Sequence, residues 1–155
     1  MNQAALFCDG TESYVIPAEP EAGSRVTLRF RTAKDDSVQV FLLTRGESLI
    51  MEKECTERGF DYYSIRCELG DEPFRYRFMI QEQDQDQVCY YGRCGVSGEA
   101  EEFYDFEIVP GFSTPDWAKG AVMYQIYTDR FYNGDPSNDV ETREYYYIGG
   151  YSSRV

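Results

Sequence analysis

The chain has 155 residues, of which 28 are acidic and 15 basic, so its formal net charge is −13. This charge repels nucleic-acid phosphates and anionic membrane surfaces, whereas a neutral sugar or a cation is compatible with it. No histidine is present, which excludes histidine general bases, Ser-His and Cys-His nucleophile systems and histidine-bound zinc within these residues.

Apolar and polar residues begin to alternate at Arg25. Val26, Leu28 and Phe30 face one way, and the residues between them face the other. A period of two predicts a half-buried antiparallel strand. A second, more buried strand is predicted over residues 38–43, and a short third one over 49–51.

The same alternation returns in the second half of the first hundred residues. Residues 60–69 place Tyr63, Ile65, Cys67 and Leu69 on one face, and further strands are predicted over 74–80, 88–91 and 103–109, with a polar hairpin loop at 81–87. Strands at roughly ten-residue spacing, with no convincing amphipathic helix, are typical of an all-β fold. We therefore predict an immunoglobulin-like antiparallel β-sandwich over residues 1–111.

Two prolines and a glycine interrupt the strand pattern between residues 110 and 115. They predict a stiff linker over residues 112–117. Trp117 is the single tryptophan, and we expect it to be a packing anchor between the parts that the linker joins.

Residues 121–127 are almost continuously apolar. Such a run suits a strand that is buried on both faces, as in a parallel sheet. The 28 residues after Tyr127 are too few for a crossover and a return strand, which need about 30. We expect a second domain to begin here, over residues 118–155, and to be incomplete.

A turn rich in side-chain oxygens follows this run. Its amide and carboxylate groups belong to Asn133, Asp135, Asn138 and Asp139. Ca²⁺ takes six to eight oxygen ligands of these types, but the same residues also favour plain surface turns. From spacing alone, the plain turn is the better interpretation.

The cysteines are odd in number and form no C-x-x-C pair: Cys8, Cys55, Cys67, Cys89 and Cys94. We expect free thiols in a reducing compartment, although Cys89 and Cys94 are near enough in sequence to form a bridge. The first residues have no basic region and no long apolar run, so we expect no signal peptide, no membrane span and a cytoplasmic location.

Residues 115–139 carry a family likeness. The stretch PDWAKGAVMYQIYTDRFYNGDPSND resembles the entry into the catalytic barrel of glycoside hydrolase family 13, most closely the neopullulanase, cyclomaltodextrinase and maltogenic amylase group. The residues before it, including Tyr90-Tyr91-Gly92, resemble that group's N-terminal sandwich, the family 34 carbohydrate-binding module.

The resemblance implies an α-glucan hydrolase whose first (β/α)₈-barrel strand is residues 122–127. It also implies that Asn133, Asp135, Asn138 and Asp139 match the family's structural calcium positions, which moves calcium ahead of the plain turn. The family adds a later Gly-Gly-Asp, whereas here Gly149-Gly150 is followed by Tyr151, so we expect the matching motif beyond Val155.

The family hydrolyses α-glucosidic bonds with retention, using an Asp nucleophile and a Glu acid/base about 5 Å apart. None of the motifs that carry them is present, so no catalytic residue is assigned and the chain by itself is expected to be inactive. Tyr62, Tyr90 and Tyr91 are candidates for stacking on glucose rings. The group's module also serves dimerisation, so a homodimer through the N-terminal domain is a further expectation.

Two other functions fit the residues. The chain could be a stand-alone α-glucan-binding module, or a non-enzymatic immunoglobulin-like domain whose tyrosine-rich surface meets a protein. The apolar run over 121–127 argues against both, because a solvated tail would not carry it.

Overall fold

A computed structural model describes residues 1–155 except 84–86, 128–130, 140–145, 148–149 and 152–155. The chain divides into two compact units, Met1–Thr114 and Pro115–Val155, each of which is described by itself. The second unit includes η3 (Pro136–Asn138), β11 (Tyr146–Tyr147) and β12 (Gly150–Tyr151).

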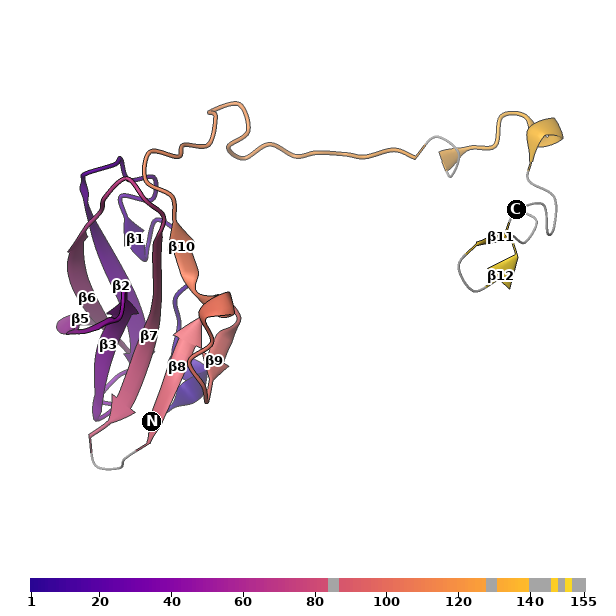
Figure 1. Cartoon of the computed structure of the whole chain (residues 1–155). Helices are drawn as coiled ribbons and strands as arrows, with labels where there is room; N and C mark the ends of the chain where they lie inside the picture. The colour runs from indigo at the N-terminus through magenta and orange to yellow at the C-terminus, as the bar shows by residue number, and fades with distance from the viewer. Residues whose placement is uncertain (84–86, 128–130, 140–145, 148–149, 152–155) are drawn as a thin grey trace. The chain divides into compact units, whose positions relative to one another are not determined.

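The first unit is a sandwich of two antiparallel sheets, as predicted (Figure 1). The four-stranded sheet has the order β1-β2-β6-β5; the six-stranded sheet has the order β4-β3-β7-β8-β9, and β10 also pairs with β7. The elements are η1 (Gln3–Ala5), β1 (Val15–Ile16), β2 (Arg25–Ala33), β3 (Val38–Thr44), β4 (Glu47–Ile50), β5 (Glu52–Glu57), β6 (Phe60–Glu68), β7 (Phe74–Glu82), β8 (Val88–Gly92), β9 (Gly95–Ser97), η2 (Glu102–Tyr104) and β10 (Phe106–Ile108).

The core lies between the inner faces of the two sheets. In β2, Val26, Leu28 and Phe30 are fully buried, while the residues between them are half-buried, so the predicted alternation is confirmed. The side chain of Phe30 contacts the other sheet: its ring centroid lies 4.5 Å from that of Phe78 in β7. Burying side chains of this size stabilises a fold by about 1.5–3 kcal/mol each.

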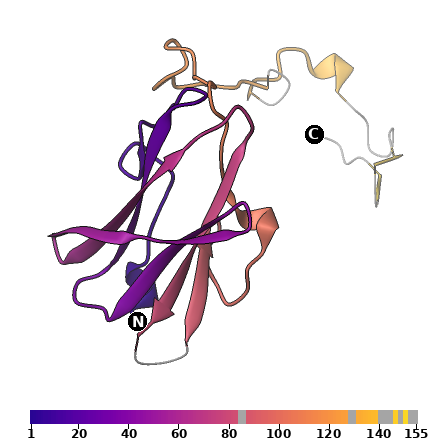
Figure 2. The same cartoon turned by 60° about the vertical axis from the view of Figure 1, so that its left-hand side comes forward.

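The short strand predicted at 49–51 is in fact part of a longer element that changes sheets. β4 pairs with β3 in one sheet, and β5 pairs with β6 in the other (Figure 2). Met51 lies between them, is 4% exposed, and donates its N–H to the carbonyl of Val40 at 2.8 Å. The exposed, polar pattern of β5 concealed this strand from the sequence, because it has no apolar alternation.

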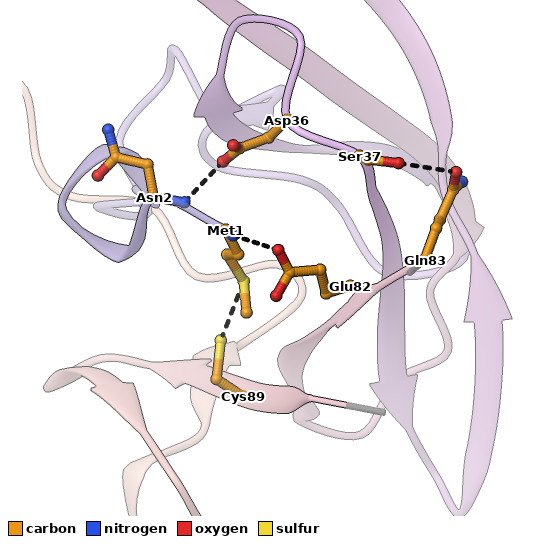
Figure 3. Close-up of polar contacts among 7 residues, drawn as sticks. All are labelled: Met1, Asn2, Asp36, Ser37, Glu82, Gln83 and Cys89. Atoms are coloured by element: carbon orange, nitrogen blue, oxygen red, sulfur yellow. Dashed lines mark hydrogen bonds and ion pairs between the residues drawn. The ribbon is translucent and has the colours of Figure 1, made fainter. Parts of the chain in front are cut away.

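The first residues lie at one end of the sandwich (Figure 1), and Figure 3 shows their polar contacts. The α-ammonium group of Met1 pairs with the carboxylate of Glu82 at the end of β7. The backbone N–H of Asn2 donates to Asp36 at 2.9 Å, and the Met1 sulfur lies 3.6 Å from the thiol of Cys89 in β8. These contacts join the chain start to the end of β7, to β8 and to the turn before β3.

All five cysteines are free, as expected, and no bridge joins Cys89 to Cys94. Cys89 is buried, whereas Cys94 is exposed in the turn between β8 and β9. Burial raises the pKa of the Cys8 thiol to about 12, so this group stays protonated at neutral pH.

Residues 121–127 do not form the predicted strand. No sheet pairs with them, and their side chains are exposed, with Val122 at 96%, Met123 at 92% and Tyr124 at 81%. A parallel strand needs a neighbouring strand, and none of the strands that the structure describes pairs with this segment. Trp117 is 82% exposed within its own unit, and its role as a packing anchor between the two parts stays a prediction.

The last predicted sandwich strand, 103–109, is shorter than expected. Residues 103 and 104 belong to η2, and β10 covers only Phe106–Ile108.

In the part of the chain that the structure describes, no helix is long and apolar enough to cross a membrane.

Candidate functional site

Tyr91 lies in the core and not on the surface. Its side chain is 8% exposed, and its ring centroid is 5.2 Å from that of Phe30 and 6.4 Å from that of Phe106. Neighbouring residues in a strand point to opposite faces, so Tyr90 and Tyr91 cannot both face outward. The expectation that Tyr91 stacks on a sugar is therefore wrong in this structure.

Tyr62 lies in β6 between the buried residues Asp61 and Tyr63. Its ring is half-buried, and the guanidinium of Arg29 lies 4.9 Å from the ring centroid. Arg29 is held there by Glu54, with 2.9 Å between Nε and Oε2. One face of Tyr62 is thus covered by an arginine, which leaves less of the ring for a ligand.

Tyr90 faces outward from β8 and borders a hollow. The hollow has a volume of about 280 Å³ and lies beside β8, β9 and η2. It is lined by Arg77, Tyr90, Gly92, Cys94, Gly95, Val96, Ser97, Glu99, Glu101, Tyr104 and Asp105. Tyr62 and Tyr90 lie in different sheets, so they do not form one site.

One wall of this hollow depends on Gly92. The backbone N–H of Arg93 donates to the carbonyl of Tyr104 at 2.9 Å, which holds η2 against the end of β8. A Cβ atom on Gly92 would lie 2.3 Å from the same carbonyl oxygen, closer than any real contact. Only glycine permits this approach, and it brings the half-exposed Tyr104 into the lining that Tyr90 also borders.

An ion pair of two half-buried side chains forms another part of the lining. Arg77 Nε lies 2.7 Å from Asp105 Oδ1, and the side chains are 12% and 11% exposed. Arg77 Nη2 also donates to Asp105 Oδ2 at 3.1 Å. Burial raises the pKa of Asp105, and the Arg77 guanidinium opposes this shift. The guanidinium and the carboxylate therefore pair with each other at this wall of the hollow.

The sequence did not single out Gly92, Tyr104, Arg77 or Asp105 as a group. The alternation in β7 predicts that Arg77 points outward, and Gly92 belongs to the Tyr-Tyr-Gly segment of the family resemblance. Their meeting with Tyr104 and Asp105 depends on how the chain returns after β9, and local periodicity carries no information about that path.

The oxygen-rich turn lies in the second unit. Asn133 Nδ2 donates to both carboxylate oxygens of Asp139, at 2.8 and 3.0 Å. Asp135 caps η3 instead, accepting the backbone N–H of Ser137 at 3.0 Å and its hydroxyl at 2.6 Å. These two hydrogen bonds lower the pKa of Asp135. The side chain of Asn138 lies outside the described residues, and so does Gly149.

The donor chemistry of this turn fits a hard cation, because carboxylate and amide oxygens are the ligands that Ca²⁺ takes. The two ends of the turn, Asn133 and Asp139, are already in contact. Among the described residues, no three Asp, Glu, Cys or His side chains form a group that could hold a metal. Any cation would therefore depend on amides and on backbone carbonyls as well.

The sandwich, its two sheets and its position before the apolar run define a class of module. Residues 1–109 match the family described as "Alpha amylase, N-terminal ig-like domain". The chain belongs to this family, which confirms the immunoglobulin-like sandwich.

The similar proteins are α-glucan enzymes by name. Neopullulanase 2 of Thermoactinomyces vulgaris is 32% identical over 149 residues, which cover 87% of this chain and 25% of that protein. An amylopullulanase of Thermoanaerobacterium thermosulfurigenes is 42% identical over 95 residues, 56% of this chain and 5% of its own length. A solved structure of a cyclomaltodextrinase superposes with a TM-score of 0.59 at 28% identity, covering 91% of this chain and 26% of that one.

These matches confirm the resemblance to the neopullulanase and cyclomaltodextrinase group. The chain spans about a quarter of the length of the neopullulanase and of the cyclomaltodextrinase, and 5% of the length of the amylopullulanase.

Proposed function

We propose that this chain is the N-terminal part of an α-glucan hydrolase of the α-amylase family. The sandwich is its accessory module, and the residues after Thr114 begin its catalytic barrel. The similarity to the neopullulanase supports this, because it covers 87% of the chain, more than the 109 residues of the module.

The exposed apolar run carries the proposal on the structural side. Residues 121–127 leave a nearly continuous apolar segment in water, with three consecutive side chains more than 80% exposed. Each square ångström of apolar surface left in water costs about 25 cal/mol relative to its burial. A segment of this kind needs neighbouring strands, and a barrel of about 250 residues supplies them.

The catalytic carboxylates lie outside this chain. A retaining mechanism needs an Asp nucleophile and a Glu acid/base about 5 Å apart, on later barrel strands. Residues 1–155 alone are therefore inactive, while the complete polypeptide from the source cells hydrolyses pullulan, starch or cyclodextrin.

Reducing-sugar release by the two preparations tests this proposal. Activity in the complete polypeptide and none in residues 1–155 is the expected result. Hydrolysis by a clean preparation of residues 1–155, or none by the complete polypeptide, contradicts it.

A structural calcium ion belongs to the proposal. Asn133, Asp135, Asn138 and Asp139 would hold it, and the ion would cross-link the loop after the first barrel strand. Calcium should then raise the unfolding temperature of the complete enzyme, because a ligand that binds only the folded state stabilises it. An unfolding temperature that does not change between EDTA and excess calcium would exclude the ion.

The remaining partners follow from the same proposal. The ligand is a neutral α-glucan, which suits a net charge of −13. Five free thiols suit a reducing compartment, so the location is cytoplasmic.

The sandwich serves homodimer formation, and sedimentation analysis of the complete enzyme checks this, with a monomer as the contrary result.

A further inference from the structure

We propose that the carboxylate of Glu19 acts as a latch that fixes the chain where it leaves the sandwich, as far as Thr114. The backbone N–H of Thr114 donates to Glu19 Oε1 at 3.0 Å, although the two residues are 95 positions apart. Glu19 lies in the loop after β1, and Thr114 ends the segment after β10. We call residues 109–114 the exit segment.

A second backbone contact holds the exit segment in the same place. The N–H of Gly111 donates to the carbonyl of Pro20 at 2.9 Å, and Pro20 is buried. The N–H of Phe112 donates to the carbonyl of Val109 at 3.2 Å, which closes a turn within the segment. Gly111 has a φ of 77°, in the left-handed region that favours glycine. The exit segment therefore follows a defined path along the loop after β1.

Hydrogen bonds hold this segment more than side-chain burial does. Phe112 is 63% exposed and Val109 is 47% exposed, so these apolar side chains bury little of their surface. A hollow of about 470 Å³ borders the segment, and Glu19, Phe112 and Thr114 contribute to its lining. A segment with little buried apolar surface opens locally at low cost, so loss of the Glu19 acceptor should release it.

The acceptor and the following residue both restrict the backbone at Thr114. A hydrogen bond to an ionised acceptor is about twice as strong as one between neutral groups. Glu19 is half-buried, so solvent weakens this bond only in part. Pro115 follows directly, and a proline restricts the residue before it to extended conformations. Together these features fix the direction in which the chain leaves the sandwich.

The latch lies within the first unit and does not depend on any enzymatic activity. In the enzyme proposed above, it would set the direction in which the sandwich delivers the chain to the barrel. The tests below use residues 1–155, which that proposal holds to be inactive. Failure of the latch therefore leaves the hydrolase proposal intact, and failure of the hydrolase proposal leaves the latch intact.

The first test measures amide hydrogen exchange at Thr114. Exchange in Glu19→Ala should be about tenfold faster than in wild type, as expected for loss of a hydrogen bond to a charged acceptor. Amides of β2 and β7 should be unaffected. Glu21→Ala is the matched control, because its side chain is exposed in the same loop and alanine retains the carbonyl that binds Ser24. Unchanged exchange at Thr114 in Glu19→Ala, or equal acceleration throughout the sandwich, would overturn the proposal.

A conservative variant separates the hydrogen bond from the rest of the side chain. Glu19→Gln retains an oxygen that accepts a hydrogen bond, so exchange at Thr114 should stay closer to wild type than to Glu19→Ala. Exchange in Glu19→Gln as fast as in Glu19→Ala would contradict the assigned bond.

Chymotrypsin provides an independent readout. Cleavage needs backbone that opens locally, so wild type should resist cutting after Phe112 despite the exposure of this ring. Glu19→Ala and Gly111→Ala should both be cut there, the second because alanine is strained at a positive φ. Gly98→Ala is the control, because its φ lies outside that region and a Cβ atom there meets nothing within 4 Å. Mass spectrometry identifies the cut, and resistance of both variants, or cleavage after Phe112 in wild type, would show that the latch does not hold the segment.

Discussion

Asp61 in β6 is 1% exposed, yet it carries a charge. Lys53 Nζ lies 2.8 Å from its Oδ2, the Thr56 hydroxyl donates to Oδ1 at 2.5 Å, and the backbone N–H of Asp35 donates to Oδ2 at 3.0 Å. Burial alone raises the pKa of Asp61, but these hydrogen bonds outweigh burial and hold the pKa below its ordinary 3.8. The carboxylate thus fastens β5 and the turn before β3 to β6.

Replacing Asp61 with asparagine should lower the free energy of unfolding at pH 7 by about 2 kcal/mol, because a buried charged partner is lost. Since the folded pKa is depressed, the carboxylate stabilises fully above pH 3.8 and loses this effect as pH falls through the folded value. Urea unfolding at pH 7 and at lower pH measures both. The exposed Asp71→Asn is the control, and equal effects in both variants contradict the assignment.

At the scale of elements, β7 is the centre of the second sheet and its end receives the first residue of the chain. β3, β8 and β10 all pair with β7. The Met1 α-ammonium group contacts Glu82, and the hydrogen bond to that carboxylate raises the pKa of the α-amino group above 8.0 (Figure 3). This ion pair therefore links the end of a central strand to the first residue of the chain.

This contact predicts a pH dependence on the alkaline side. The raised pKa means that the α-ammonium group stabilises the fold fully below pH 8.0, and that this effect is lost as pH rises through the folded value. Wild type should lose more thermal stability than Glu82→Gln between pH 7 and pH 10. Exposed Glu72→Gln should behave as wild type. Parallel curves for wild type and Glu82→Gln would show that the pair contributes nothing.

At the scale of the whole molecule, the two units differ in how well they bury apolar residues. The first unit has a continuous core of buried residues from both sheets. In the second unit, the described residues 121–127 are exposed. Proteases cut where backbone is exposed and opens readily.

Limited proteolysis of residues 1–155 should therefore remove residues after Thr114 and leave the sandwich intact. Chymotrypsin should cut first near Trp117, Tyr124 and Tyr127, which are largely exposed. Mass spectrometry of the surviving fragment identifies the boundary. Equal resistance of both units would mean that the second one also folds by itself.

The amino-acid sequence alone determined the class of fold and the direction of most core side chains. Alternation is local, since each residue in a strand points opposite to its neighbour, so Val26, Leu28 and Phe30 could be assigned inward without a structure. The long motif after Pro115 likewise identified the enzyme group, because a motif is read directly from the chain.

The tertiary structure decided what no local pattern contains. It buried Tyr91 and left Tyr90 beside the hollow, because pairing with β7 sets which face of β8 meets the core. It also placed the Tyr104 carbonyl against Gly92, although the residues are far apart in sequence. Such contacts depend on strand register and on the path of the connections between strands. The packing of the whole sandwich decides both, and no single segment does.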